Sequence, residues 1–105
     1  DGPGNSNLMA DRPTGLPAEP QLENAWFRSY RVDLVPGEET AIQTHRFQSM
    51  VVQVADGLFH VTRRDGITAE LDAQGDWAWR DANEPYVVRN AGRVPSAVVI
   101  NEGRR

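Results

Sequence analysis

Short β-prone runs that end in turn signals follow one another through most of this chain, and no stretch shows a helical period. The runs cover residues 26–35, 40–44, 49–54, 58–63, 67–71, 77–80, 86–90 and 96–101. β-Branched and aromatic side chains dominate them, as is typical of strands. Asp56-Gly57 and Asp65-Gly66 predict type I′ hairpin turns, in which both central residues need positive φ. This spacing predicts an all-β fold, a single small antiparallel β-barrel or jelly roll.

The beginning of the chain has a different composition. Residues 1–21 are rich in Gly, Pro, Asn and Asp, and the prolines interrupt any regular element. We expect residues 1–23 to form an extended, flexible tail, either native or a remnant of added sequence. The ordered part is then one domain over residues 24–105, because a chain of 105 residues has room for one hydrophobic core.

Charge and composition narrow the classes of partner. The net charge is −4, and the 11 basic residues, all of them arginine, are scattered along the chain. Nucleic-acid binding is not expected, because it needs a clustered basic surface. Neither lysine nor cysteine occurs, which excludes the chemistry of both side chains. No apolar run approaches the ~20 residues that span a bilayer, so we expect a soluble protein with no membrane contact. Its compartment stays open between the cytoplasm and the periplasm or secretion, because a chain without cysteine suits all of them.

Two stretches resemble the two motifs of the cupin family. The first has the spacing Gly37, five residues, Gln43, one residue, His45, four residues, Met50, six residues, Gly57. The second runs from Gly75 through Pro85-Tyr86 to Asn90. The resemblance covers residues 26–102 and implies a cupin barrel. It also implies a homodimer, often with N-terminal strands paired across the interface.

The cupin metal centre is typically three histidines and one glutamate, and the resemblance shows which residues replace them here. Gln43, His45 and Tyr86 stand at the histidine positions, and Met50 stands at the glutamate position. Only His45 is an ordinary metal ligand. An amide oxygen, a thioether and a protonated phenol are poor ligands for Fe(II), Mn(II) or Zn(II). We therefore expect no metal cofactor, with a divalent metal held through His45 as the disfavoured alternative.

These four replacements also predict a pocket for a small organic molecule. Trp77 and Trp79, two residues apart on one strand face, could stack on a ring of the ligand. His45 is the catalytic candidate, since an imidazole can act as a general base near neutral pH. The competing interpretation is structural: His45 is a hydrogen-bonded core histidine, its neighbours fill the barrel, and the tryptophans belong to the core or to a dimer interface.

Three further polar residues are weaker candidates. His60 alternates with Phe59 and Val61, and is expected to face outward and to hold no metal. Asp81 and Glu84 are two carboxylates near the open end of the barrel, where we expect a solvated loop rather than an acid–base pair.

Three functions of different classes remain. The first is a metal-free barrel that binds an unidentified small molecule. The second is an enzyme of oxygenase or isomerase type, either metal-dependent through an atypical site or metal-free with His45 as base. The third is a structural or interaction protein that uses the barrel as a scaffold. We place the binding module first because of the replaced ligand positions, since the fold alone does not determine a function.

Overall fold

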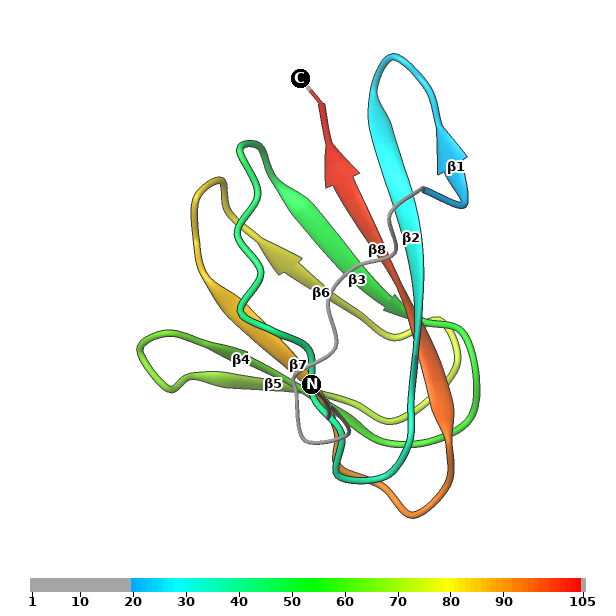
Figure 1. The fold of residues 1–105 in the computed structure, drawn as a ribbon. Coiled ribbons are helices and arrows are strands. Elements are labelled where there is room, and N and C mark those ends of the chain that lie inside the picture. The colour runs from blue at the N-terminus through cyan, green and yellow to red at the C-terminus, as the bar shows by residue number, and fades with distance from the viewer. Residues whose placement is uncertain (1–19, 105) are drawn as a thin grey trace, which may run out of the picture.

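The computed structural model describes residues 20–104, and all regular structure in this range is β (Figure 1). The strands are β1 (Leu22–Glu23), β2 (Phe27–Leu34), β3 (Ser49–Gln53), β4 (Phe59–Arg63), β5 (Thr68–Leu71), β6 (Trp77–Arg80), β7 (Tyr86–Asn90) and β8 (Ser96–Gly103). Most of the expected tail, residues 1–19, lies outside the described residues, and β1 falls within its last positions. No described segment is a helix of the length and apolarity needed to cross a membrane.

The strands form two antiparallel sheets. The larger sheet has the order β1-β2-β8-β3-β6, and the smaller has the order β5-β4-β7. Figure 1 shows the two sheets as separate layers joined by loops, with β8 running through the middle of the larger layer between β2 and β3. This arrangement confirms the predicted all-β class.

Residues 40–44 were expected to form a strand but make only isolated bridges. The Thr40 amide donates to the Val88 carbonyl at 2.9 Å, and Gln43 and Tyr86 exchange backbone hydrogen bonds of 2.8 and 3.0 Å. The segment therefore follows the edge of β7 without a continuous ladder. Ile42 lies between the two contacts with 71% of its surface exposed. The segment nevertheless fixes the backbone just before His45.

The hydrophobic core lies between the two sheets. The larger sheet contributes Val32, Leu34, Val51, Ala78, Val98 and Ile100, and the smaller contributes Phe59, Val61, Leu71, Tyr86 and Val88. These side chains recur at every second position, because successive residues of a strand point to opposite faces. Each large apolar side chain buried in this way stabilises the fold by roughly 1.5–3 kcal/mol.

The turn between β4 and β5 differs from the expected type I′ turn. Asn83 is the one described non-glycine residue with positive φ, so the aspartates of the two Asp-Gly pairs do not adopt the required conformation. Gly66, with φ of 91°, donates to the Arg63 carbonyl at 2.9 Å, and the Arg63 amide donates to Ile67 at 2.8 Å. The pattern is a three-residue loop, a type I turn followed by a left-handed glycine. The Asp65 carboxylate favours it by accepting from the Ile67 amide at 3.0 Å.

The side chain of Asn90 connects three chain segments by hydrogen bonds at one end of the barrel. Its side-chain amide donates to the carbonyls of Leu34 at 2.8 Å and Val94 at 2.9 Å. Its carbonyl oxygen accepts from the Gly92 amide at 2.9 Å. The side chain is fully buried, and these three bonds satisfy its polar atoms.

Candidate functional site

His45 lies inside the barrel and contacts two strands. Its Nε2 is 2.7 Å from the hydroxyl of Tyr86 on β7, and its Nδ1 is 2.8 Å from Oε2 of Glu102 on β8. The backbone amide of Asn83 donates to the His45 carbonyl at 2.7 Å. Together with the Gln43–Tyr86 bridge, this contact holds the histidine from both sides. The structure therefore places the backbone of Gln43 beside that of Tyr86, and the His45 ring against the Tyr86 hydroxyl.

The chemistry of the Glu102 carboxylate and of the Tyr86 phenol determines which atoms of this cluster donate hydrogen bonds and which accept them. Burial raises the pKa of Tyr86 well above its usual range. The Ser49 side chain opposes the shift from nearby, although its hydroxyl lies outside hydrogen-bond geometry. The Glu102 carboxylate can only accept, so His45 Nδ1–H donates to it. In the neutral imidazole Nε2 then carries the lone pair, and it accepts from the protonated phenol of Tyr86. Glu102 thus fixes the tautomer and the orientation of the imidazole.

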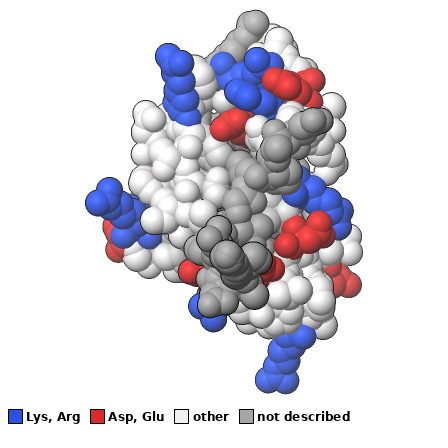
Figure 2. Space-filling view, in the orientation of Figure 1, with Lys and Arg blue, Asp and Glu red and all other residues white. Residues whose placement is uncertain are grey.

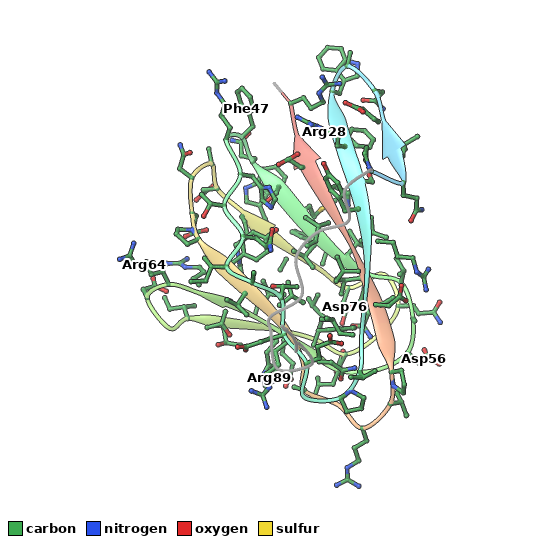
Figure 3. The ribbon with its side chains drawn as sticks, viewed as in Figure 1. Arg28, Phe47, Asp56, Arg64, Asp76 and Arg89 are labelled. Carbon is green, nitrogen blue, oxygen red and sulfur yellow. The ribbon has the colours of Figure 1, made fainter. Side chains whose placement is uncertain are left out.

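Glu102 is a site residue that the sequence analysis missed. It lies one residue beyond the end of the run expected at 96–101, because β8 continues to Gly103. Its second carboxylate oxygen is 3.5 Å from the Nε of Arg28, which β2 places directly opposite it. Figure 3 labels Arg28 at the upper end of β2. The sequence carries no signal at Glu102, because its approach to His45 depends on how β8 pairs with β3.

Met50 does not face His45. The expectation that this residue, at the glutamate position of the motif, would line the pocket is therefore wrong. Strand β3 turns Ser49 and Val51 inward, and both are buried. Met50 therefore points to the outer face, where it pairs with Trp79 and Asn101 of the neighbouring strands. A shift of one residue exchanges the two faces of a strand. Ser49 is thus the β3 residue on the His45 side.

Trp77 and Trp79 also lie on the outer face of the larger sheet. They are 60% and 49% exposed, whereas Ala78 and Arg80 between and after them are buried. The predicted pocket of six residues is therefore split, with Gln43, His45 and Tyr86 inside and Met50 and the two tryptophans outside. The alternation along β6 follows from the period of two, and it brings in a buried arginine that the sequence analysis did not select.

The weaker candidates are surface residues. His60 is half-exposed, and its Nε2 faces Glu70 at 3.3 Å on the outside of the smaller sheet, as expected. Asp81 accepts from the Trp79 indole at 3.3 Å, and Glu84 pairs with Arg63 at 3.2 Å. These carboxylates are engaged in surface contacts, in agreement with a solvated loop.

The donor set at His45 does not fit the metal centre that the resemblance implies. Both nitrogens of His45 are engaged by Tyr86 and Glu102, and the Gln43 amide nitrogen donates to the Ala41 carbonyl at 2.9 Å. Across residues 20–104, no three His, Cys, Asp or Glu residues gather as a metal site would require. The position that faces His45 from β3 carries a hydroxyl rather than a carboxylate.

A recess of about 520 Å³ lies beside the cluster, within the size range of small-molecule pockets. Its lining residues are Ile42, Thr62, Arg63, Arg64, Pro85, Tyr86 and Val87. Tyr86 therefore belongs both to the recess and to the His45 cluster. Figure 3 shows Arg64 projecting from the β4–β5 end of the molecule. On the face drawn in Figure 2, described arginines and carboxylates are interspersed.

Comparison with solved structures identifies proteins with the same architecture. A cupin domain from Bordetella pertussis Tohama I has a TM-score of 0.70 and 21% identity, covering 90% of this chain and 98% of that one. An RmlC-like cupin with a double-stranded β-helix fold from Methanocaldococcus jannaschii has a TM-score of 0.70 and 12% identity, covering 92% and 86%. A predicted oxalate decarboxylase from Thermotoga maritima has a TM-score of 0.61 and 18% identity, covering 73% and 65%. No protein-family model and no curated protein sequence matches the chain. At these identities the likeness concerns the fold, and it confirms the cupin barrel predicted from the two motifs.

Proposed function

Because the chain has the cupin fold without the donor set of a cupin metal centre, we propose that it is a metal-independent barrel that binds a small organic molecule. The observation that carries this proposal is the pair of hydrogen bonds that occupy both nitrogens of His45, at 2.7 Å to Tyr86 and 2.8 Å to Glu102. A histidine held in this way orients neighbouring groups and offers no free lone pair to a cation. We propose that the cluster replaces the metal centre that the resemblance implies.

The polar end of the barrel supplies the chemistry for a ligand. Gln43, His45 and Tyr86 provide an amide, an imidazole and a phenol within a mostly apolar interior. Small-molecule sites typically combine apolar walls with a few convergent polar groups. Since Tyr86 also lines the recess, a ligand seated there would lie against the residue that bonds to His45.

Two measurements on the same preparation test this proposal. Metal content is measured by mass spectrometry on untagged protein, purified without added metal and again after reloading with Fe(II), Mn(II), Zn(II), Ni(II) and Cu(II). A thermal-shift screen of small molecules is then run with and without a chelator. We expect metal far below one equivalent and ligand shifts that the chelator leaves unchanged.

Matched variants show whether the interior histidine is responsible. His45→Ala should lose the ligand shift, whereas His60→Ala, which removes the exterior histidine, should retain it. One tight equivalent of metal that disappears in His45→Ala and persists in His60→Ala would overturn the proposal, and metal-dependent chemistry would replace it.

A second candidate function is metal-free acid–base catalysis. The chain of hydrogen bonds from Glu102 through His45 to Tyr86 favours it, because a carboxylate that orients an imidazole is a common arrangement for a general base. This candidate requires that His45 exchange its proton in the working pH range. An NMR titration of the two imidazoles, assigned with His60→Ala, measures this, and an imidazole that keeps one tautomer from pH 5 to 9 would contradict it.

We also infer a homodimer that buries the outer face of the larger sheet. Trp77 and Trp79 are largely exposed there, and Met50 and Val52 are half-buried beside them. Exposed apolar faces of this kind mark contact surfaces. Replacing Trp77 and Trp79 together by serine should reduce the mass measured by light scattering from dimer to monomer. Ile67→Ser, which changes an exposed apolar residue in the β4–β5 turn of the smaller sheet, should leave the mass unchanged, and a monomeric parent protein would contradict the inference.

A further inference from the structure

Ser49 Oγ and Arg80 Nε are among the buried polar atoms on the inner face of the larger sheet that have no hydrogen-bond partner. The two residues are 3% and 7% exposed, and the pairing of β3 with β6 places them directly opposite each other. Side chains opposite each other on one face of an antiparallel pair have Cβ atoms roughly 4.5–5.5 Å apart. Two unused donors therefore share one place in the barrel.

The buried guanidinium of Arg80 also has no counterion among residues 20–104. Its terminal nitrogens donate to the carbonyls of Trp79 at 2.5 Å and Val61 at 3.1 Å, which are neutral acceptors. Two other arginines have a buried Nε without a hydrogen bond, but each faces a glutamate in an ion pair, at 3.5 Å for Arg28 and 3.2 Å for Arg63. Arg80 makes no such pair. Burial lowers the pKa of Arg80 while Glu84 opposes this from a distance, so the group is a desolvated cation.

A buried charge without a partner is costly, and native proteins usually supply one. The other groups that face this place are known. Tyr86 lies close enough for Ser49, Glu102 and Arg80 to act on its ionisation. Glu102 is the neighbour of Ser49 on the side away from Arg80, and its carboxylate is already engaged by Arg28 and His45. An anion would therefore be attracted to the Arg80 side of Ser49.

We propose that Arg80 and Ser49 form an oxyanion site inside the barrel, with Arg80 Nε–H and the Ser49 hydroxyl as donors to one small carboxylate or inorganic oxyanion. This inference rests on the proposed function, because it assigns the ligand class of the same polar end. A guanidinium with a free Nε–H matches the geometry of a carboxylate oxygen. The buried setting favours anions of a few heavy atoms over long or bulky acids.

The test uses acetate and inorganic phosphate as separate probes at constant ionic strength. Thermal unfolding of the whole protein should show a saturable rise, roughly 5–10 °C at ten times the dissociation constant. The acetate arm represents organic acids and the phosphate arm represents inorganic oxyanions, so their relative affinities identify the source. In parallel, the ¹H–¹⁵N signal of the Arg80 Nε–H, assigned by its loss in Arg80→Gln, should move with the same saturation.

Ser49→Ala keeps the test decisive if Arg80→Gln fails to fold. Because the Ser49 hydroxyl has no partner, its removal should leave the stability of the anion-free protein unchanged and weaken anion binding at least tenfold. Ser96→Ala is the matched control: it removes a buried hydroxyl that donates to the Ala55 carbonyl at 3.1 Å, so it should lower stability and retain the anion response. Arg93→Gln, which changes an exposed arginine outside the recess, should also retain the response.

The outcomes separate this inference from the proposed function. No saturable shift and an unmoved Arg80 signal would overturn the oxyanion site. An anion response that survives unchanged in Ser49→Ala would do the same. In either case a neutral ligand that binds without metal and is lost in His45→Ala would leave the proposed function standing. A stoichiometric metal bound through His45 would overturn the proposed function whatever the anion result.

Discussion

Alkaline pH should destabilise this domain through one buried phenol. Burial raises the pKa of Tyr86 far above the ordinary value of 10.0. A raised pKa in the folded state means that the stability contributed by the neutral phenol is complete below pH 10 and is lost as pH rises towards the folded value. At pH 11 the unfolded state gains about 1.4 kcal/mol from ionisation that the folded state does not share. The free energy of unfolding should therefore fall by about 1.4 kcal/mol between pH 9 and pH 11.

The absence of lysine and cysteine makes this measurement clean, since no amine or thiol side chain titrates in the same range. Urea denaturation at pH 8, 9, 10 and 11, followed by tryptophan fluorescence, gives the free energy of unfolding of the parent, Tyr86→Phe and Tyr30→Phe. Tyr86→Phe should remove the alkaline loss, and Tyr30→Phe, which keeps the Tyr86 phenol, should retain it. At pH 8, Tyr86→Phe should be less stable by about 1–3 kcal/mol, because His45 Nε2 loses its buried donor. An equal alkaline loss in the parent and Tyr86→Phe would refute the reasoning.

Four further substitutions make three tests of other parts of the structure, each by urea denaturation at pH 8. Asn90→Ala removes three buried hydrogen bonds of 2.8–2.9 Å and should lower the free energy of unfolding by about 3 kcal/mol; a loss below about 1 kcal/mol would contradict this. Gly57→Ala should destabilise more than Gly66→Ala, because its new Cβ would lie 2.9 Å from a side-chain carbon, whereas Gly66 has open space; equal losses would show that φ strain alone acts. Glu102→Gln should cost about 1–2 kcal/mol and weaken ligand binding, because the imidazole and a guanidinium lose their carboxylate; full stability would mean that Glu102 does not hold His45.

The strands could be predicted from the sequence because their signals are local. Alternation and turn residues defined the runs at 77–80 and 86–90 with the bounds that the structure shows, and the others to within one or two residues. The run at 40–44 has the same composition but lacks a continuous partner, so it makes bridges rather than a strand. Pairing depends on the distant edge of β7, which no local pattern encodes. The turn types failed for a related reason, since Asp65 is stabilised by a neighbouring amide in a turn that the Asp-Gly pair alone does not specify.

The residues of the candidate site could be predicted only where the spacing of the motifs and the face of the strand on which a side chain lies agree. Gln43 and Tyr86 lie together because the bridge between them brings the two motifs side by side, and His45 follows from the same geometry. The motif spacing assigned Met50 to the interior. In β3, however, Ser49 lies on the inner face, and Met50, one residue later, lies on the outer face. Glu102 could not be found from either motif, because its approach to His45 depends on the register of β8 against β3. Sequence patterns thus identified the segments of the site, and strand register selected which side chains meet.

Strand register also sets the balance of charge at the polar end. One row crosses four strands of the larger sheet in the order Arg28, Glu102, Ser49, Arg80. It holds two guanidiniums and one carboxylate, and the carboxylate is already paired with Arg28 and His45. A cation placed at Ser49 would therefore meet the unpaired charge of Arg80, whereas an anion would neutralise it. A barrel that binds a metal needs the opposite balance, with carboxylate and imidazole lone pairs turned inward. We therefore expect the side chains of this row to favour an anion over a cation at this end of the barrel.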